Sequence, residues 1–416
     1  MSTDNDKTSF SGKKLLMLVC LDNIPYWNFL EENFRRYFGE VIRFNFIEYS
    51  RQNGISATER RIRELIEENG IDMVFAFSLA SDFELSPSFY LSLKDRVPLV
   101  CWFFDDDSFC EVISRYYGQA ATAVVTTDYL PLASYSKLGI PAVYYSPVQD
   151  TKIFFPVGVK KDIDVCFLGD CTKSNRSEFI EFLAAAGVKI ETYGFGSKNG
   201  FVAQEGVSAL FSRSKIVLCF AKVDGLTWLT QDDPLLGRVR QNKGHFSQVA
   251  LTGSFCLSEY APSLGRIAEI GKEVEVFGDK KELLEKVRYY LSHEKEREAI
   301  AANARKRAVA SFSAETAFPR FMNELSAVLA DRRFENPYSR EIFLSDGFKA
   351  KAVNGLTFSL FILLASGRLG NALELSLRLF GYGSRAFLAG FPAGCLRAST
   401  VLYHKISGKY REANWR

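Results

Sequence analysis

Short apolar segments alternate with amphipathic helical segments along most of this chain, and this alternation constrains the fold more than any other feature. The first series of apolar segments lies at 15–21, 71–77, 98–104, 121–126 and 142–145. Such alternation is typical of βαβ units, in which each helix returns the chain to the next strand of a parallel sheet. The amphipathic segment at 57–69 predicts a helix that ends at Gly70.

The alternation restarts after a short Pro/Gly connection at 155–158, with apolar segments at 163–168, 188–195, 215–220, 254–258 and 273–277. We therefore predict an α/β protein with two tandem Rossmann-like, doubly wound domains, residues 1–157 and 158–317. Asp279 and Glu282 form a capping box that opens a helix near the end of the second domain. Ligands of such sheets bind beyond the carboxyl ends of the strands, so the cleft between the domains is the expected site.

Two segments follow the second domain. Residues 318–340 have helical character and are expected to cross back and brace the first domain, and residues 341–416 form a basic, apolar helical tail. From Lys349 onward, ten basic residues face two acidic ones. This pattern suits short helices that rest on an anionic membrane surface through residues 349–416, but it suits equally a helical appendage with an exposed basic face.

Composition excludes several classes of protein. Lys and Arg number 52 against 49 Asp and Glu, so no charge excess indicates nucleic acid as a partner. Eight cysteines without a C-x-x-C pair and three histidines argue against a zinc site. Cysteines inside apolar runs, such as Cys101 and Cys219, are typical of a reducing compartment, and we expect a cytoplasmic protein.

Neither long apolar stretch favours a membrane span. Lys13 and Lys14 before the segment 15–21 resemble a signal peptide, but Asp22 follows at once and a first β-strand is the better interpretation. The uncharged stretch at 352–367 is shorter than the roughly 20 residues that a spanning helix needs.

Candidate ligand-binding residues of the second domain follow its predicted strands. Gly169 and Asp170 come after the segment 163–168 and before a helix, where free backbone N–H groups attract phosphate. Gly194 lies in the glycine-rich run TYGFGSKNG, which allows close approach of a ligand and lacks the pattern of an ATP-hydrolysing P-loop. A tight turn explains each of these glycines equally well.

A cluster of cationic side chains precedes the segment 254–258. Cations at a cleft can neutralise a diphosphate leaving group as its charge develops, although a solvated basic face is an equally good explanation. The cluster consists of Arg238, Arg240, Lys243 and His245.

Acidic residues follow the strands of the first domain. Asp105, Asp106 and Asp107 come after the segment 98–104, and one of them is expected to accept a hydroxyl proton or to position an acceptor. A helix N-cap accounts for at least one of the three, and the same role is the default for Asp128. The letters also match a D-x-D metal motif, but we predict no metal site.

Several ordered blocks resemble the CgeB-like spore-maturation glycosyltransferases, which belong with the group 1 glycosyltransferases of GT-B fold. The resemblance spans roughly residues 97–311. It implies a nucleotide-sugar donor held mainly by the second domain and an acceptor held mainly by the first. The D-x-D motif acts in the unrelated GT-A fold, which weakens the metal interpretation further. The blocks are WFFDDDSF, VVTTDYLPLASYSKLGI, YYSPVQD, DVCFLGD, TYGFG, SRSKIVLCF, QNKGHFSQVALTGSFCLSEY and IGKEVEVFGDKKELLEKVRYYLSHEKEREAIA.

The resemblance implies roles for individual residues. Lys243 would contact the donor diphosphate, assisted by Arg240, while Gly169 and its loop approach from the other side. Gly253 together with residues 258–260, which include Glu259 and Tyr260, would line the sugar and nucleotide.

The chain departs from the family pattern at two places. His245 stands where an Arg is usual, and Ser247-Gln248 stands where a Phe-Glu pair is usual. That glutamate is expected to bind the donor ribose, and Gln248 offers a neutral amide in its place. Donor affinity or identity therefore depends on this substitution.

The sequence thus predicts a metal-independent glycosyltransferase without an obligatory cofactor. It would move a sugar from a nucleotide-diphosphate sugar to a hydroxyl of a glycan, a lipid-linked glycan or a protein, in the cytoplasm or peripherally on the inner face of the membrane. The alternatives are a non-catalytic GT-B scaffold that binds a nucleotide sugar or glycan, and a nucleotide-sugar epimerase. The predicted catalytic residues are Asp105, Asp106 and Lys243, and the predicted donor-binding residues are Gly169, Asp170, Gly194, Arg240, Lys243, His245, Gln248, Gly253, Glu259 and Tyr260.

Overall fold

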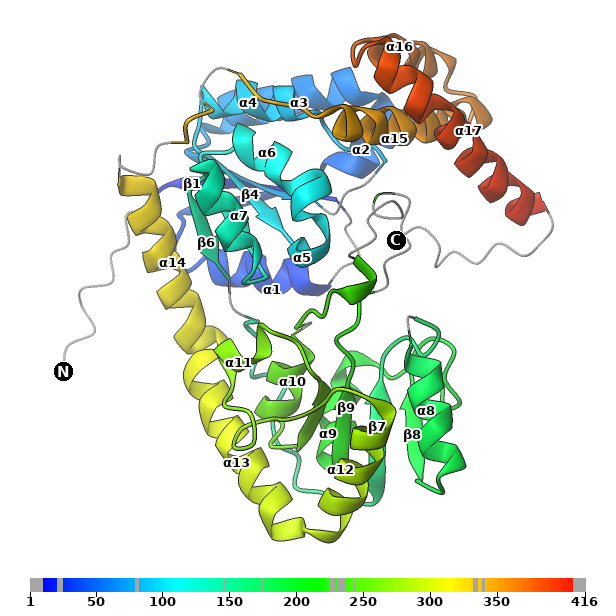
Figure 1. Ribbon diagram of the computed structural model, residues 1–416. Helices are drawn as coiled ribbons and strands as arrows, with labels where there is room; N and C mark the ends of the chain where they lie inside the picture. Colours follow the sequence, from blue (N-terminus) through cyan, green and yellow to red (C-terminus); the bar gives the residue numbers. More distant parts are fainter. Residues whose placement is uncertain are drawn as a thin grey trace.

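The computed structural model contains two α/β domains, one above the other in Figure 1, with a helical region beside the first domain. It describes residues 10–20, 25–78, 82–145, 147–173, 175–223, 229, 236–242, 244–331, 336–338 and 341–406. The predicted fold class, two doubly wound parallel sheets with a C-terminal helical part, is confirmed.

The first domain contains a six-stranded parallel sheet in the order β2-β1-β3-β4-β5-β6. The sequence pattern missed β2, a half-buried edge strand in which Arg43 and Asn45 interrupt the apolar run. Its partner β1 is buried along almost its whole length, and this difference explains why only β1 reads as apolar. The strands are β1 (Lys14–Val19), β2 (Glu40–Asn45), β3 (Met73–Ser78), β4 (Leu99–Phe103), β5 (Ala123–Thr126) and β6 (Ala142–Tyr144).

Helices connect these strands and cover both faces of the sheet. Helix α3 ends as predicted at Gly70, whose φ of 60° places it in the left-handed region that glycine adopts without strain. The helices are α1 (Pro25–Phe34), α2 (Phe46–Asn53), α3 (Ile55–Asn69), α4 (Pro87–Lys94), α5 (Asp106–Phe109), a π-helical turn (Cys110–Ser114), α6 (Arg115–Ala120) and α7 (Pro131–Leu138).

The second domain contains a five-stranded parallel sheet in the order β11-β10-β9-β7-β8. Its first strand β7 lies between β8 and β9, just as β1 lies between β2 and β3. The chain therefore adds β8 on one side of β7 and then continues on the other side with β9, while all strands stay parallel. Ligands of open α/β sheets bind beyond the carboxyl ends of the strands at such a switch point. The strands are β7 (Ile163–Leu168), β8 (Ile190–Tyr193), β9 (Ser214–Cys219), β10 (Cys256–Glu259) and β11 (Glu275–Phe277).

The helices of the second domain include the one predicted from the capping box. Asp279 Oδ1 accepts the N–H groups of Lys281 and Glu282 at 2.8 and 2.9 Å, and Leu283 and Val287 are buried on one face of α12. The helices are α8 (Arg176–Ala185), α9 (Gln204–Arg213), a short 3-10 turn (Leu236–Arg238), α10 (His245–Leu251), α11 (Leu264–Ile267), α12 (Lys280–Ser292) and α13 (Glu294–Ser311).

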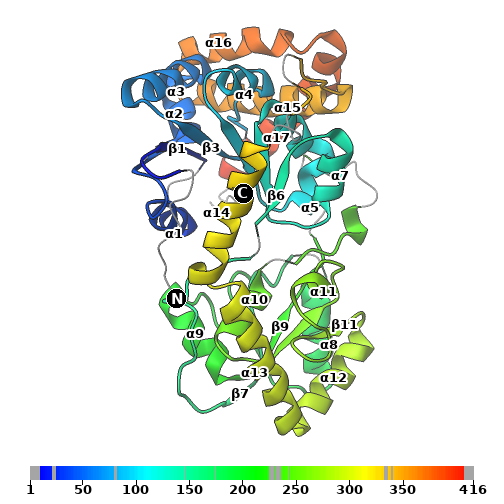
Figure 2. The same cartoon turned by 90° about the vertical axis from the view of Figure 1, so that its left-hand side faces the viewer.

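Helix α14 (Ala314–Ala330) runs from the second domain back along the first, as both views show (Figures 1 and 2). Its buried side chains Phe318, Phe321 and Met322 belong to the core of the first domain. The ring of Phe321 lies 5.2 Å from Trp102 and 4.9 Å from Tyr145. The core of the first domain is therefore completed by residues that lie beyond the second domain in the chain.

The last three helices form an appendage on the first domain: α15 (Asp346–Ala365), α16 (Leu369–Phe380) and α17 (Ser384–Ile406). Helices α15 and α17 approach closely because Gly390 and Gly394 carry no side chain. A Cβ on Gly394 would lie 2.5 Å from the Cβ of Thr357. Among the described helices, only α15 is long and apolar enough for a membrane span by length and composition, and half of its most apolar stretch is buried within the protein.

Candidate active site between the two sheets

Four aspartates gather at the carboxyl ends of β4 and β5 in the first domain. Asp105, Asp106 and Asp107 follow β4, and Asp128 follows β5. Asp105 has a φ of 52°, the one positive value among the described residues other than glycine. Backbone held in this region by a non-glycine residue is uncommon and occurs preferentially at functional sites.

Hydrogen bonds tie these aspartates to one another. Asp128 Oδ2 accepts the backbone N–H groups of Asp106 at 2.6 Å and Asp107 at 3.4 Å, so Asp128 caps helix α5. The predicted N-cap role of Asp128 for the helix that follows it is wrong, because the N-cap residue of α7 is Leu130. The N-cap residue of α5 is Asp105, whose side chain makes no cap hydrogen bond, and Asp128 takes that place from the neighbouring strand end. Asp106 Oδ2 accepts a hydrogen bond from the Tyr135 hydroxyl at 2.8 Å.

Burial changes the acidity of this cluster. It raises the pKa of Asp106 to about 6, against hydrogen bonds that lower it. Burial, with repulsion from Asp106 and Asp105, raises the pKa of Asp107 to about 7, and similar causes raise the pKa of Asp128 well above its usual value. Neighbouring buried carboxyls cannot all ionise together, so the cluster retains protons near neutral pH.

Gln241 connects this cluster to the second domain. Its Nε2 donates to Asp105 Oδ1 and to both carboxylate oxygens of Asp128, each at 3.0 Å. The residue is 2 % exposed, and its backbone N–H donates to the carbonyl of Ala221 just beyond β9. Sequence reasoning missed Gln241, because an amide beside a cluster of cations carries no signal of its own.

A second contact also joins the first domain to the second, at the carboxyl ends of their strands. The Arg266 guanidinium, from α11 of the second domain, lies 4.7 Å from the ring centroid of Tyr129, which follows Asp128. The carboxyl ends of both sheets therefore face each other, and residues at these ends make contact across the cleft.

A small hollow lies at the carboxyl ends of β9 and β10. Gln241 forms part of its wall, so the hollow adjoins the aspartate cluster. His245, the first residue of α10, which was predicted to bind the donor, also lines it. Other lining residues are Phe220, Asn242, Ser258 and Leu264.

Arg240 is held beside this hollow by Glu259. Its Nε donates to Glu259 Oε1 at 2.7 Å, and Glu259 Oε2 accepts the backbone N–H groups of Ala221 and Lys222 at 2.9 Å each. Glu259 is 2 % exposed. The carboxylate predicted to line the donor thus binds Arg240 and the loop after β9, which makes it a positioning residue. The neighbouring Tyr260 side chain is 48 % exposed.

The glycines after β7 and β8 pack the two loops together. A Cβ on Gly194 would lie 2.3 Å from the carbonyl oxygen of Gly169. Asp170 turns its carboxylate back onto Thr172, accepting its N–H at 2.9 Å and its hydroxyl at 2.7 Å. Close packing of loops therefore explains both glycines, although both lie at the switch-point end of the sheet.

Three of the predicted residues remain to be placed. Lys243 lies outside the described residues. Gln248 Nε2 donates to Gln149 Oε1 at 3.3 Å, so it contacts the connection between the domains. Gly253 follows the C-terminal end of α10 and precedes β10, with a φ of 70°. It lies before the amino end of β10, whereas Glu259 lies at the carboxyl end of that strand.

No three His, Cys, Asp or Glu side chains within the described ranges are arranged to hold a metal ion. Tyr135 donates to Asp106 and Gln241 donates to Asp105 in the aspartate cluster, while both carboxylate oxygens of Asp107 are buried without a partner among the described residues.

Comparisons with known proteins show which known fold this chain has. Residues 176–323 match a family model described as glycosyl transferase-like. A structure of Anabaena Alr3699/HepE in complex with UDP is similar over 76 % of this chain and 100 % of that one, with a TM-score of 0.56 and 13 % identity. The fold is GT-B.

Two further structures agree with this fold. Sucrose-phosphate synthase from Thermosynechococcus elongatus is similar over 76 % of this chain and 99 % of that one, with a TM-score of 0.55 and 11 % identity. A glycosyltransferase from Rickettsia africae covers 77 % of this chain and 99 % of its own, with a TM-score of 0.50 and 11 % identity. No curated protein matches this sequence.

Proposed function

We propose that this chain is a glycosyltransferase that moves a sugar from a nucleotide-diphosphate sugar to an acceptor hydroxyl without an obligatory metal. The observation that carries the proposal is that the carboxyl ends of the two sheets face each other and carry different side chains. An aspartate cluster on the first sheet meets a hollow and a positioned arginine on the second, and Gln241 bridges them. The glycosyl transferase-like match of residues 176–323 and the GT-B fold support it.

In this proposal the second domain holds the donor. The diphosphate lies at the carboxyl ends of β7 and β9, within reach of Arg240, which Glu259 orients. Lys243 is proposed to contribute a second cation, and together the two charges stabilise the departing diphosphate. The solved structure of Anabaena Alr3699/HepE in complex with UDP-glucose, a protein of the same fold, makes a UDP-sugar the first donor to test.

The first domain supplies the proton acceptor. We assign this role to Asp105, because its side chain is exposed at the cleft while Asp106 and Asp128 are buried. The acceptor oxygen forms a bond to the anomeric carbon, and the bond from that carbon to the diphosphate oxygen breaks. The nucleoside diphosphate leaves with the electron pair, and the hydroxyl proton passes to the Asp105 carboxylate.

The acceptor and the cellular location belong to the proposal as well. A glycan, a lipid-linked glycan or a protein would supply the hydroxyl, and the enzyme would act in the cytoplasm, peripherally on the membrane. The ordered sequence blocks between residues 97 and 311 also support kinship with the CgeB-like subfamily.

The direct test is release of nucleoside diphosphate from a panel of nucleotide sugars, with and without candidate acceptors. Asp105→Asn is the matched variant, because asparagine adopts the left-handed backbone readily and its Oδ1 can still accept from Gln241. We expect release by the native protein and loss of turnover in the variant with unchanged donor binding. Release that is equal in both proteins would remove Asp105 from the mechanism.

A second candidate function is a non-catalytic module that binds a nucleotide sugar or glycan. The contact of Gln248 with Gln149 favours it, because the amide that replaces the usual ribose-binding glutamate is engaged by the connection between domains. Tight donor binding with neither transfer nor hydrolysis would support this candidate against the enzyme.

A further inference from the structure

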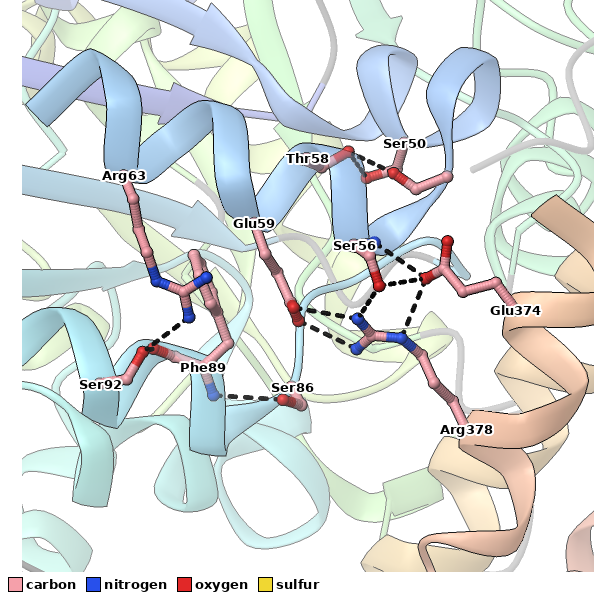
Figure 3. A network of polar contacts seen from close by, with 11 residues as sticks. Ser50, Ser56, Thr58, Glu59, Arg63, Ser86, Phe89, Ser92, Glu374 and Arg378 are labelled. Atoms are coloured by element: carbon pink, nitrogen blue, oxygen red, sulfur yellow. Dashed lines mark hydrogen bonds and ion pairs between the residues drawn. The ribbon is translucent and has the colours of Figure 1, made fainter. Parts of the chain in front are cut away.

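Helix α16 turns Glu374 and Arg378 toward the protein, together with the buried Ala372, Leu375 and Leu379, and turns a second set of apolar side chains toward solvent. Arg378 donates to both carboxylate oxygens of Glu59 on α3, at 3.0 and 2.9 Å (Figure 3). Glu374 Oε1 accepts the backbone N–H of Ser56 at 2.9 Å and its hydroxyl at 2.7 Å. These contacts fix the rotation of α16 about its own axis, and with it the residues that remain outside.

Four large apolar side chains form the outward stripe of α16. Their spacing of four, four and three residues places them on one face of the helix. They are Leu369, Leu373, Leu377 and Phe380, exposed by 67, 65, 67 and 66 %. The inward face of α16 is apolar as well, whereas a surface helix of a soluble protein normally keeps its outward face polar, so the outward stripe suits an apolar environment.

Helix α17 extends the same apolar surface. The ring of Phe380 stacks on Phe387 with centroids 5.1 Å apart, which joins the end of α16 to the start of α17. Leu388 and Leu396 are 73 and 71 % exposed. They are spaced three and eleven residues after Arg385, an exposed cation on the same face.

The positive charge of the appendage indicates what its outward face binds. Between Glu374 and Glu412 the sequence contains no acidic residue, but it contains six cations. Two of these, Arg378 and Arg397, bind Glu59 and Asp82 of the first domain. Of the cations whose side chains the structure describes, Arg385 is the one left on the outward face. This face therefore combines leucines with Arg385 and, within the described residues, carries no acidic side chain, which fits an anionic lipid surface. A second copy of this face offers Arg385 no acidic partner among the described residues, so self-association fits less well.

We propose that the outward face of α16 and α17 lies in the interfacial layer of an anionic bilayer. Leu369, Leu373, Leu377, Leu388 and Leu396 enter the acyl boundary, while Arg385 meets lipid phosphate. Figures 1 and 2 place α16 on the side of the first domain that points away from the second. The Glu59–Arg378 and Asp82–Arg397 pairs fasten the appendage to the first domain, so the acceptor-binding half of the proposed enzyme is held at the membrane. Binding itself does not depend on the proposed transfer reaction.

Flotation of the full chain with vesicles tests the proposal. Vesicles of phosphatidylcholine alone are compared with vesicles that also contain phosphatidylglycerol. The variant Leu373→Glu/Leu377→Glu changes only exposed side chains, and Phe201→Glu replaces an 80 % exposed phenylalanine of the second domain as the matched control. An unchanged melting temperature verifies that each variant folds.

We expect the native protein and the Phe201→Glu control to float with the anionic vesicles. The double variant should lose roughly tenfold or more in partitioning, and added salt should weaken binding of the native protein. Equal flotation of the double variant, or no flotation of the native protein, would overturn the proposal. A concentration-dependent dimer that the double variant abolishes, without lipid binding, would replace the bilayer by a second copy of this chain.

Discussion

The two sheets share a strand order but use buried carboxylates in opposite ways. In the second domain, Glu259 is buried with Arg240 and two backbone N–H groups as partners. In the first domain, both carboxylate oxygens of Asp107 are buried without a hydrogen-bond partner among the described residues. A buried charge that is paired supports structure, whereas one that is unpaired costs stability and is kept only where another role demands it. The second domain therefore uses its buried carboxylate to position Arg240, whereas the first domain is proposed to use its carboxylates for proton transfer.

The largest expected effect is on turnover. Asp105→Asn should lower kcat by about 100-fold or more, because it removes the proposed proton acceptor while preserving the backbone conformation. Nucleotide release under saturating donor measures it. A loss below about twofold would assign the proton to another group.

Removing the paired carboxylate should cost the most stability. Glu259→Gln leaves the Arg240 guanidinium without its counter-charge, and we expect a loss of about 2–4 kcal/mol in the free energy of unfolding. Urea denaturation measures it. The matched control is Glu40→Gln, which breaks the exposed Lys14–Glu40 pair and should cost less than about 1 kcal/mol. If both variants lose the same free energy of unfolding, the buried Glu259 pair stabilises the fold no more than the exposed Lys14–Glu40 pair does.

The unpaired carboxyl should give the opposite result. The pKa of Asp107 is raised from 3.8 to about 7 in the folded chain, so protonation favours folding. Its contribution to stability is fully present below about pH 4 and is lost as pH rises through about 7. Asp107→Asn should therefore stabilise the protein by about 1–2 kcal/mol at pH 8 and by little at pH 4.

Unfolding of the native protein and of Asp107→Asn at these two pH values provides the measurement. A variant that is less stable at pH 8 than the native protein would show that Asp107 is paired in its ionised form.

The bridge between the edges should have the smallest effect. Gln241→Ala removes donation to Asp105 and Asp128, and we expect a loss of about 1 kcal/mol in the free energy of unfolding. Gln241→Glu should cost more, because it adds a carboxylate to a cluster that already retains protons. An alanine variant that is less stable than the glutamate variant would contradict this order.

Much of the fold can be predicted from the sequence, because buried parallel strands are apolar along their whole length and helices begin and end at residues such as Asp279 and Gly70. The edge strand β2 could not be predicted, since Arg43 and Asn45 lie in it and one side of it faces solvent. The apolar stretch at 352–367 reads as too short for a membrane span, whereas helix α15 begins earlier, at Asp346, ends at Ala365 and reaches 20 residues.

The candidate site was predicted only in part. The aspartates after β4 and the cations before β10 are visible in the chain, but the contact between Asp105 and Gln241 joins residues 136 positions apart. Such a contact depends on how the two domains meet. The outward leucines of α16 were also missed, because their exposure depends on the ion pairs that fix the helix against α3.

The most direct test of the division of labour between the two edges is calorimetric titration of the full chain with UDP-, GDP-, ADP-, CMP- and dTDP-sugars. Three proteins are compared: native, Asp105→Asn, and Arg240→Gln, which retains a hydrogen-bond donor toward Glu259. We predict that one nucleotide sugar binds the native protein and Asp105→Asn alike, and binds Arg240→Gln about tenfold or more weakly. Loss of binding in Asp105→Asn with full binding in Arg240→Gln would contradict the assignment of donor and acceptor to the two sheets.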